Sequence, residues 1–174
     1  MSTWDPARTA EFFAEYGERE WTRFEDGRTP GPSLTTHTRM LEGYVRPGDR
    51  VLDAGSGPGR FTLELLRLGA HVTALDISPG QLELLRARVP DVEAVVGDIN
   101  DLSRFPDDTL EVVRTGVLPQ GDGYGHLPMR MYLWEELEEL LAPHGEVVEG
   151  AEKIAYDPGS RSCGEHIIGV MRVA

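Results

Sequence analysis

The residues best suited to chemistry are an acid and three glycines within one short stretch. Asp53 ends an apolar run, and Gly55, Gly57 and Gly59 follow at every second position. Glycine adopts a positive φ readily and has no Cβ, so a ligand can lie directly against the backbone. An amphipathic segment comes next. The pattern predicts a buried strand, a tight turn and a helix N-terminus, with a ligand held at the turn.

Two kinds of ligand-binding turn were compared with this stretch. A dinucleotide turn has the pattern G-x-G-x-x-G, but its third glycine is replaced here by Arg60. Together with Asp53, this disfavours an NAD-binding oxidoreductase. The run V-L-D-A-G-S-G-P-G instead resembles the first motif of class I S-adenosylmethionine (SAM)-dependent methyltransferases. The resemblance implies that the loop, including Ser56, holds the methionine half of SAM and that Asp53 lies near its amino group.

Two further acids follow predicted strands. Asp76 ends the second strand, about where a Rossmann-like sheet places a carboxylate for ribose hydroxyls. Asp98 follows the third strand, and the resemblance implies that it contacts the adenine amine. A turn acid without a ligand is the alternative for both. The resemblance adds two residues packing on adenine and a contact at the end of the fourth strand, which are Ile77, Ile99 and Thr115.

Methyl transfer from a sulfonium needs alignment of donor and acceptor, and a base only where the acceptor arrives protonated. Candidates for a proton acceptor, or for a contact with the methyl acceptor, are His37, Tyr124 and His126. For each of them a structural or solvent-exposed role is the alternative. The last two lie in a glycine- and proline-rich stretch after the fourth strand, where α/β sheets place substrate contacts. No Cys, His and Asp residues have metal-ligand spacing, so no metal is expected.

The elements around these motifs alternate between strand and helix. A capping Ser78, followed by proline at the first helical position and by Gln81 at the third, predicts a helix start. Four strand–helix units in a row favour an α/β fold, a Rossmann-like doubly wound, mostly parallel sheet with helices on both faces and an antiparallel strand near the C-terminus. Strands are predicted over 50–53, 71–76, 92–98, 110–115, 146–149, 154–156 and 166–173, and helices over 60–68 and 132–141 and from 79.

Residues 1–44 precede the first strand and carry aromatic side chains at helical spacing. The run Y-G-E-R-E-W-T-R-F resembles the N-terminal cap of one methyltransferase subgroup, which implies a lid over the cofactor; packing on the sheet is the alternative. We expect a single domain over 1–174, formed by this helical cap and a SAM-binding core over 45–174. Helices are predicted over 10–16, 18–24 and 35–44.

The resemblance weakens after Thr115, and two interpretations remain. In the first, 110–115 is the fourth strand and 146–149 the fifth, in a compact but complete sheet. In the second, 114–149 matches a later segment of the subgroup, so a central strand and helix are missing and the acceptor pocket is incomplete. The first predicts a methyltransferase acting on a small molecule. The second predicts a SAM-binding protein without catalysis.

The net charge and the composition limit the classes of partner that the protein is expected to bind. Asp and Glu total 30 against 17 Lys and Arg, a net charge of −13, which repels nucleic-acid phosphates and anionic lipid. Many acids and a single lysine, Lys153, resemble proteins of salt-loving microbes; compositional drift is the alternative. The N-terminus lacks a signal-peptide order, no apolar run reaches ~20 residues, and the lone Cys163 cannot form an internal disulfide. A cytoplasmic monomer or homodimer is expected.

Overall fold

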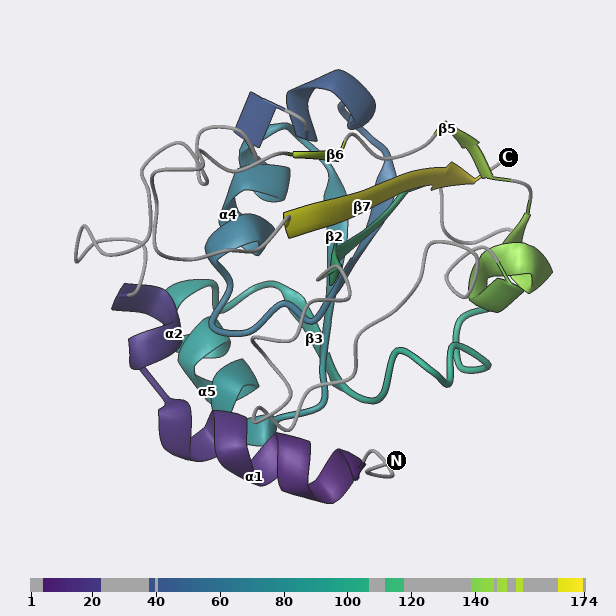
Figure 1. The fold of residues 1–174 in the computed structure, drawn as a ribbon. Coiled ribbons are helices and arrows are strands. Elements are labelled where there is room, and N and C mark those ends of the chain that lie inside the picture. The colour runs from purple at the N-terminus through teal and green to yellow at the C-terminus, as the bar shows by residue number, and fades with distance from the viewer. Residues whose placement is uncertain are drawn as a thin grey trace.

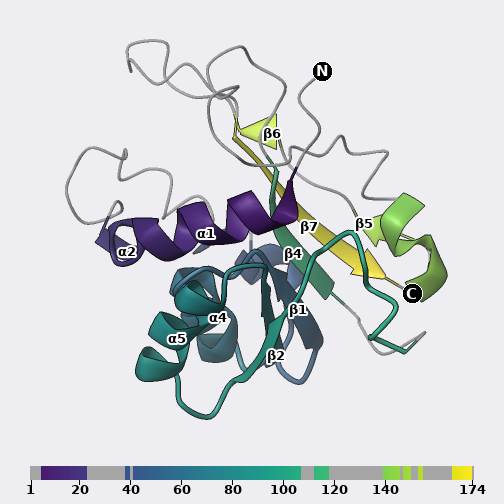
Figure 2. The ribbon, with the colours of Figure 1, turned by 90° about the horizontal axis from the view of Figure 1, so that it is seen from below.

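A central sheet organises the computed structural model, which describes residues 5–22, 38–39, 41–106, 112–117, 139–145, 147–149, 153–154 and 166–173. The strands are β1 (Arg50–Ala54), β2 (His71–Asp76), β3 (Glu93–Val96), β4 (Val112–Val117), β5 (Val147–Glu149), β6 (Lys153–Ile154) and β7 (His166–Val173). Their order is β3-β2-β1-β4-β7-β5, with β6 paired to β7; Figure 1 labels β3, and Figure 2 labels β1 and β4. The first four strands are parallel, whereas β7 is antiparallel to each of its partners.

Helical segments cover both faces of this sheet. Alternation along β1 sends Val51 and Leu52 to opposite faces, so β1 is buried on both. Val51 packs with Leu65 on one face, and Leu52 packs with Leu141 on the other. No helix among the described residues is long and apolar enough to cross a membrane. The named helices are α1 (Pro6–Tyr16), α2 (Arg19–Thr22), α4 (Arg60–Arg67), α5 (Pro79–Arg88) and the 3-10 helix η1 (Ala142–His144); residues 38–39, 41–44 and 139–141 are also helical.

The first helix starts earlier than predicted. A carboxylate oxygen of Asp5 accepts hydrogen bonds from the N–H groups of Ala7 (3.0 Å) and Arg8 (3.3 Å), and Pro6 occupies the first turn. These are strong helix-start residues, although they stand several positions ahead of Phe12, the first aromatic residue within the helix. The helix ends at Gly17, whose φ is 52°. In Figures 1 and 2, α1 lies beside α5 and α2 follows it.

The predicted capping role of Ser78 is wrong. Its side chain makes no capping hydrogen bond, although α5 does begin at Pro79. The acid at the end of β2 takes over part of this role, because Asp76 accepts from the Ser78 N–H at 2.8 Å. Gln81 does not complete a capping box either, since its amide nitrogen donates to α1 and the turn after it.

The position of β4 separates the two interpretations of the C-terminal half. A strand has two hydrogen-bonding edges, and those of β4 are taken by β1 and by β7. The fifth strand, β5, therefore lies beyond β7 and not beside β4. No parallel strand fits between β4 and β7, which favours the interpretation with a missing central strand.

A partly buried ion pair joins β7 to the start of β1. The guanidinium of Arg172 donates to both carboxylate oxygens of Asp49, at 2.8 and 3.1 Å, and to the carbonyl oxygen of Tyr44 at 3.1 Å. The Arg46 N–H donates to the same carboxylate at 2.8 Å. The hydrogen bond and charge of Arg172 hold the pKa of Asp49 below its usual value. This pair secures the last strand on the core.

Candidate functional site

A glycine loop connects β1 to α4 at the carboxyl end of the parallel strands. Gly55, Gly57 and Gly59 have φ values of 73°, 54° and 93°. Residues other than glycine rarely adopt this left-handed backbone conformation, so the loop requires glycine at these positions, as the spacing predicts.

The first and third glycines face different surroundings. A Cβ added at Gly55 would meet nothing within 4 Å, whereas one at Gly59 would lie 3.1 Å from Cγ of Leu85 on α5. Gly59 therefore permits close packing of the loop on α5. Gly55 faces open space and is the loop residue best placed to lie against a ligand.

The second glycine faces α2 and α5; the N-terminal helices α1 and α2 are called the cap helices below. A Cβ added at Gly57 would lie 3.6 Å from Cγ of Glu20 and 3.9 Å from Oε1 of Gln81. The former belongs to α2 and the latter to α5. The cap helices thus reach the loop itself.

Every N–H group of the loop already has an acceptor within the protein. Acceptors are the Leu75 carbonyl oxygen for Gly55 (2.8 Å) and Ser56 (3.0 Å), Asp76 for Gly57 (2.8 Å), and the Ser56 carbonyl oxygen for Gly59 (3.1 Å). Pro58 has no N–H group. A loop that cradles phosphates must present free N–H groups to them. The arrangement therefore suits a ligand without phosphate in contact with this loop.

Asp53 is fully buried at the end of β1. Its Oδ2 accepts a hydrogen bond of 2.6 Å from the hydroxyl of Thr62, which is also fully buried on α4. The acid is predictable from the local sequence pattern, whereas this partner was not predicted. Thr62 stands in the first turn of a predicted helix, where its hydroxyl could have been matched to the acid before the loop.

Asp76 connects the glycine loop to α5. Its two carboxylate oxygens accept from the N–H groups of Gly57 and Ser78, both at 2.8 Å. Only 9% of the residue is exposed. Burial raises its pKa to about 6 against the two hydrogen bonds, and the charge of Asp53 adds to the rise. Two buried carboxylates thus lie close enough to interact.

The remaining predicted cofactor residues lie along the same edge. The Gly97 N–H donates to the carbonyl oxygen of Asp76 at 3.0 Å, which brings the segment after β3 to the end of β2. In that segment Asp98 accepts from the backbone and side-chain nitrogens of Asn100, at 2.9 and 2.6 Å. Thr115 is aligned with Ala54 in the β1–β4 register.

The two predicted adenine neighbours have half-buried side chains. Ile99 packs against the cluster around Leu52, and Ile77 directly follows Asp76. The candidate proton acceptors His37, Tyr124 and His126 lie outside the described residues.

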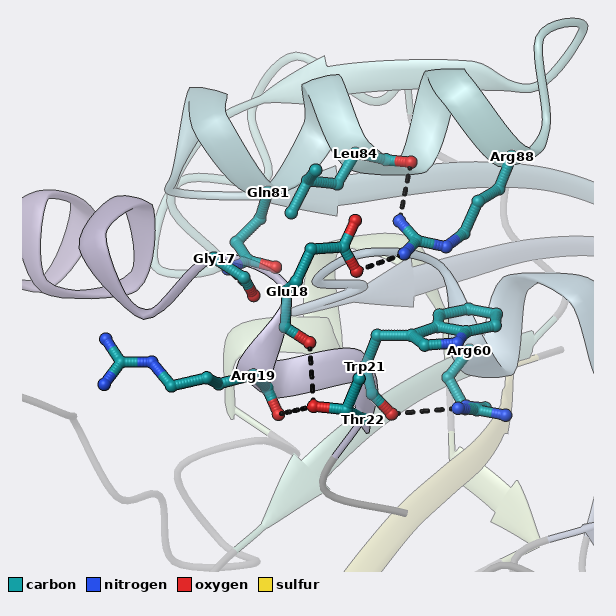
Figure 3. A network of polar contacts seen from close by, with 9 residues as sticks. All are labelled: Gly17, Glu18, Arg19, Trp21, Thr22, Arg60, Gln81, Leu84 and Arg88. Carbon is teal, nitrogen blue, oxygen red and sulfur yellow. Dashed lines mark hydrogen bonds and ion pairs between the residues drawn. The ribbon is translucent and has the colours of Figure 1, made fainter. Parts of the chain in front are cut away.

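Two arginines fasten the cap helices beside the loop. The guanidinium carbons of Arg60 and Arg88 lie 3.8 and 4.3 Å from the centroid of the Trp21 ring. Arg60 also donates to the Trp21 carbonyl oxygen at 2.8 Å, while Arg88 pairs with Glu18 and donates to the Leu84 carbonyl oxygen (Figure 3). The residue that breaks the dinucleotide pattern therefore anchors the cap.

Gln81 makes the second attachment of the cap helices. Its Nε2 donates to the carbonyl oxygens of Phe13 (2.6 Å) and Gly17 (3.2 Å), and only 1% of the residue is exposed. Its Oε1 is buried without a hydrogen-bond partner, as is the hydroxyl of Ser56. The local sequence does not indicate this role, because the partner carbonyls are 68 and 64 positions away in the chain.

The fold and the glycine loop define a Rossmann-like protein of the methyltransferase type. The methyltransferase domain family model matches residues 51–145, and the chain belongs to this family. Magnesium protoporphyrin IX methyltransferase from Synechocystis PCC 6803, solved with bound SAM, shares the fold. The TM-score is 0.64 at 15% identity, over 99% of both chains.

Sequence relatives are similar over shorter stretches. The chain is 35% identical over 78 residues to malonyl-acyl-carrier protein O-methyltransferase of Serratia marcescens, covering 45% of this chain and 30% of that protein. It is 32% identical over 129 residues to ribosomal RNA small subunit methyltransferase A of Mycobacterium sp. (strain KMS), covering 69% of this chain and 43% of that protein. The chain thus matches less than half the length of these two relatives.

Proposed function

We propose that the chain is a SAM-dependent methyltransferase acting on a small-molecule acceptor. The observation that carries the proposal is the glycine loop, whose N–H groups are all engaged within the protein beside buried Asp53 and Asp76. SAM bears a sulfonium and an ammonium group but no phosphate. Carboxylates and bare glycine backbone suit such a ligand better than a dinucleotide. Family membership supports the same assignment.

The proposed SAM site follows the edge of the parallel strands. The open space at Gly55 and the unpartnered hydroxyl of Ser56 fit the methionine half, with Asp53 near its ammonium group. Asp76 is assigned to the ribose hydroxyls. The full set proposed to bind the cofactor is Asp53, Gly55, Ser56, Gly57, Gly59, Asp76, Ile77, Asp98, Ile99 and Thr115.

The chain has to position groups more than to activate them. SAM, when bound, supplies a methyl group already activated by the sulfonium charge. The loop and the strand-end acids hold the donor in one orientation, and the cap helices against Gly57 exclude water from that side of the loop. A protonated acceptor also needs a base, for which His37, Tyr124 and His126 remain the candidates.

The net charge of −13 supports a small-molecule acceptor. The names of the two sequence relatives include both a carrier-bound malonyl group and ribosomal RNA. An acidic surface repels RNA phosphates, so we assign an acceptor of the small-molecule kind. We further propose one domain over 1–174, with a cap over 1–44 and a core over 45–174, acting in the cytoplasm as a monomer or homodimer.

Calorimetric titration tests the cofactor assignment. SAM and S-adenosylhomocysteine (SAH) are expected to bind with one-to-one stoichiometry, and NAD is expected to give no heat of binding. Binding of NAD but not of SAH would overturn the proposal. Release of labelled methyl groups from SAM across a panel of small acceptors, with RNA as a comparison, then tests catalysis.

A second candidate is a SAM-binding protein without catalysis. The pairing of β4 with both β1 and β7 favours it, because a sheet short of a central strand has fewer strand ends from which to build an acceptor pocket. SAH binding without methyl release for any acceptor would select this function.

A further inference from the structure

The side-chain amide of Gln81 has a fixed orientation. Both groups that face its nitrogen are backbone carbonyl oxygens, those of Phe13 and Gly17, and these can only accept hydrogen bonds. The nitrogen must therefore point to α1, and the oxygen must point away from it. Oε1 is buried and has no partner, which is unfavourable for a carbonyl oxygen in a protein interior.

The unpartnered oxygen lies against the glycine loop. It is 3.9 Å from the position that a Cβ would take at Gly57, and Cγ of Glu20 is 3.6 Å from the same position. The amide oxygen of Gln81 therefore approaches the middle glycine from α5, and the methylene stem of Glu20 approaches it from α2. A buried amide oxygen without a partner favours a donor group, and hydrogen bonds are strongest where the donor is charged.

The methionine end of SAM carries two charged groups, a carboxylate and an ammonium. Only the ammonium can donate a hydrogen bond to a carbonyl oxygen. The ribose hydroxyls are the other donors on that side, and they are the groups assigned to Asp76 in the proposed site. The ammonium is therefore the group that matches Oε1 of Gln81.

We propose that Gln81 is a positioning residue for the methionine end of the cofactor. Its Nε2 holds the cap helices beside the loop, and its Oε1 accepts a hydrogen bond from the ammonium group. One side chain thereby contacts both the cap helices and the bound cofactor. The inference rests on the proposed SAM-binding function, and it assigns to Gln81 a contact beyond the loop and the strand-end acids.

The test compares two ligands in two proteins. Binding of SAH and of its deamino analogue, which keeps the carboxylate and lacks only the amino group, is measured by calorimetry for wild type and Gln81→Met. Gln81→Met should weaken SAH binding about tenfold or more, the range for a hydrogen bond to a charged group, and change binding of the deamino analogue by less than about threefold. Equal losses for both ligands would show that Gln81 acts only through the cap and would overturn the proposal.

Two further variants separate the cap from the ligand contact. Trp21→Leu removes the stacking with Arg60 and Arg88 but leaves Gln81 in place, so it should affect both ligands by the same factor. Gln81→Lys keeps a donor for the Phe13 and Gly17 carbonyls, and its cation should weaken binding of SAH more than binding of the deamino analogue. This variant keeps the test possible if Gln81→Met does not fold. A wild type that binds neither SAM nor SAH would refute the proposed function itself, whereas SAH binding with unchanged selectivity in both Gln81 variants would refute only this inference.

Discussion

The Gly57 N–H donates a hydrogen bond of 2.8 Å to a carboxylate oxygen of Asp76. The second oxygen of this carboxylate accepts from Ser78 at the start of α5. One side chain therefore joins the loop after β1 to the helix after β2. The acid proposed for the ribose also holds the loop in shape, so binding and folding depend on the same residue.

Asp76→Ala should weaken binding of SAH by about 1.5–3 kcal/mol, because the ribose loses hydrogen bonds to a charged group and the Gly57 N–H loses its acceptor. Calorimetry on wild type and variant measures the loss. Asp101→Ala is a suitable control, since Asp101 is an exposed acid on the segment after β3, and within the described part of the chain its carboxylate accepts hydrogen bonds from Ser103 alone. Unchanged SAH affinity in Asp76→Ala would remove this acid from the site.

The stability effect of Asp76→Ala should depend on pH. Burial raises the folded-state pKa of Asp76 to about 6 from the ordinary value of 3.8. The ionised carboxylate is thus disfavoured in the folded state, and this penalty is absent below pH 3.8, develops between about 4 and 6, and reaches about 3 kcal/mol above 6. The variant lacks the penalty. In urea unfolding, Asp76→Ala should therefore lower the free energy of unfolding less at pH 7 than at pH 4. An equal loss of stability at both pH values would contradict the raised pKa of Asp76.

The three loop glycines provide a matched set of substitutions. All have positive φ, so alanine at any of them carries a backbone strain of about 1–2 kcal/mol. Gly55→Ala places its methyl group in open space and should mainly reduce SAH affinity. Gly59→Ala places it 3.1 Å from Leu85 and should mainly reduce the free energy of unfolding. Calorimetry and urea unfolding on both variants test whether one substitution affects mainly binding and the other mainly stability. Wild-type affinity for SAH in Gly55→Ala would contradict this prediction.

Arg172→Ala should lower the free energy of unfolding by about 1–3 kcal/mol, because the Asp49 carboxylate loses its ion-pair partner and keeps the hydrogen bond from the Arg46 N–H. The pKa of Asp49 is depressed, so the pair contributes above the ordinary value of 3.8 and its contribution is lost as pH falls below it. Arg67→Ala is the control: its pair with Glu64 is solvent-exposed and should matter by less than about 0.5 kcal/mol. Equal effects of the two substitutions in urea unfolding at pH 7 would show that the Arg172–Asp49 pair stabilises the fold no more than the pair on the surface.

Local patterns were sufficient to predict the loop and its strands. The apolar run before Asp53, the glycine spacing and the acid at the end of β2 each depend on neighbours within a few residues. For the same reason the positive φ values of the loop follow from glycine alone. The start of α1 was predictable in principle, since Asp5 and Pro6 are standard helix-start residues.

Contacts between distant segments were not predictable in the same way. Ser78 has the right type for a cap, yet Asp76 satisfies its N–H and the hydroxyl is left unused. Gln81 donates to a carbonyl 68 positions earlier, a distance that no local pattern encodes. The pairing of β4 with β7 joins strands separated by much of the C-terminal half, and two interpretations of the sequence allowed different neighbours for β4.

Salt should stabilise the fold and weaken SAM binding. With a net charge of −13, like charges repel in the folded state. The screening length falls from about 30 Å at ~0.01 M salt to about 3 Å at 1 M, so this repulsion is largely removed at high salt. The melting temperature should therefore rise between these two concentrations of sodium chloride. SAM carries a net positive charge and SAH carries none, so raising salt should reduce SAM affinity modestly and leave SAH affinity nearly unchanged. A flat or falling melting temperature would show that the charge is too widely spread to destabilise the fold, and would remove the support for a salt-adapted composition.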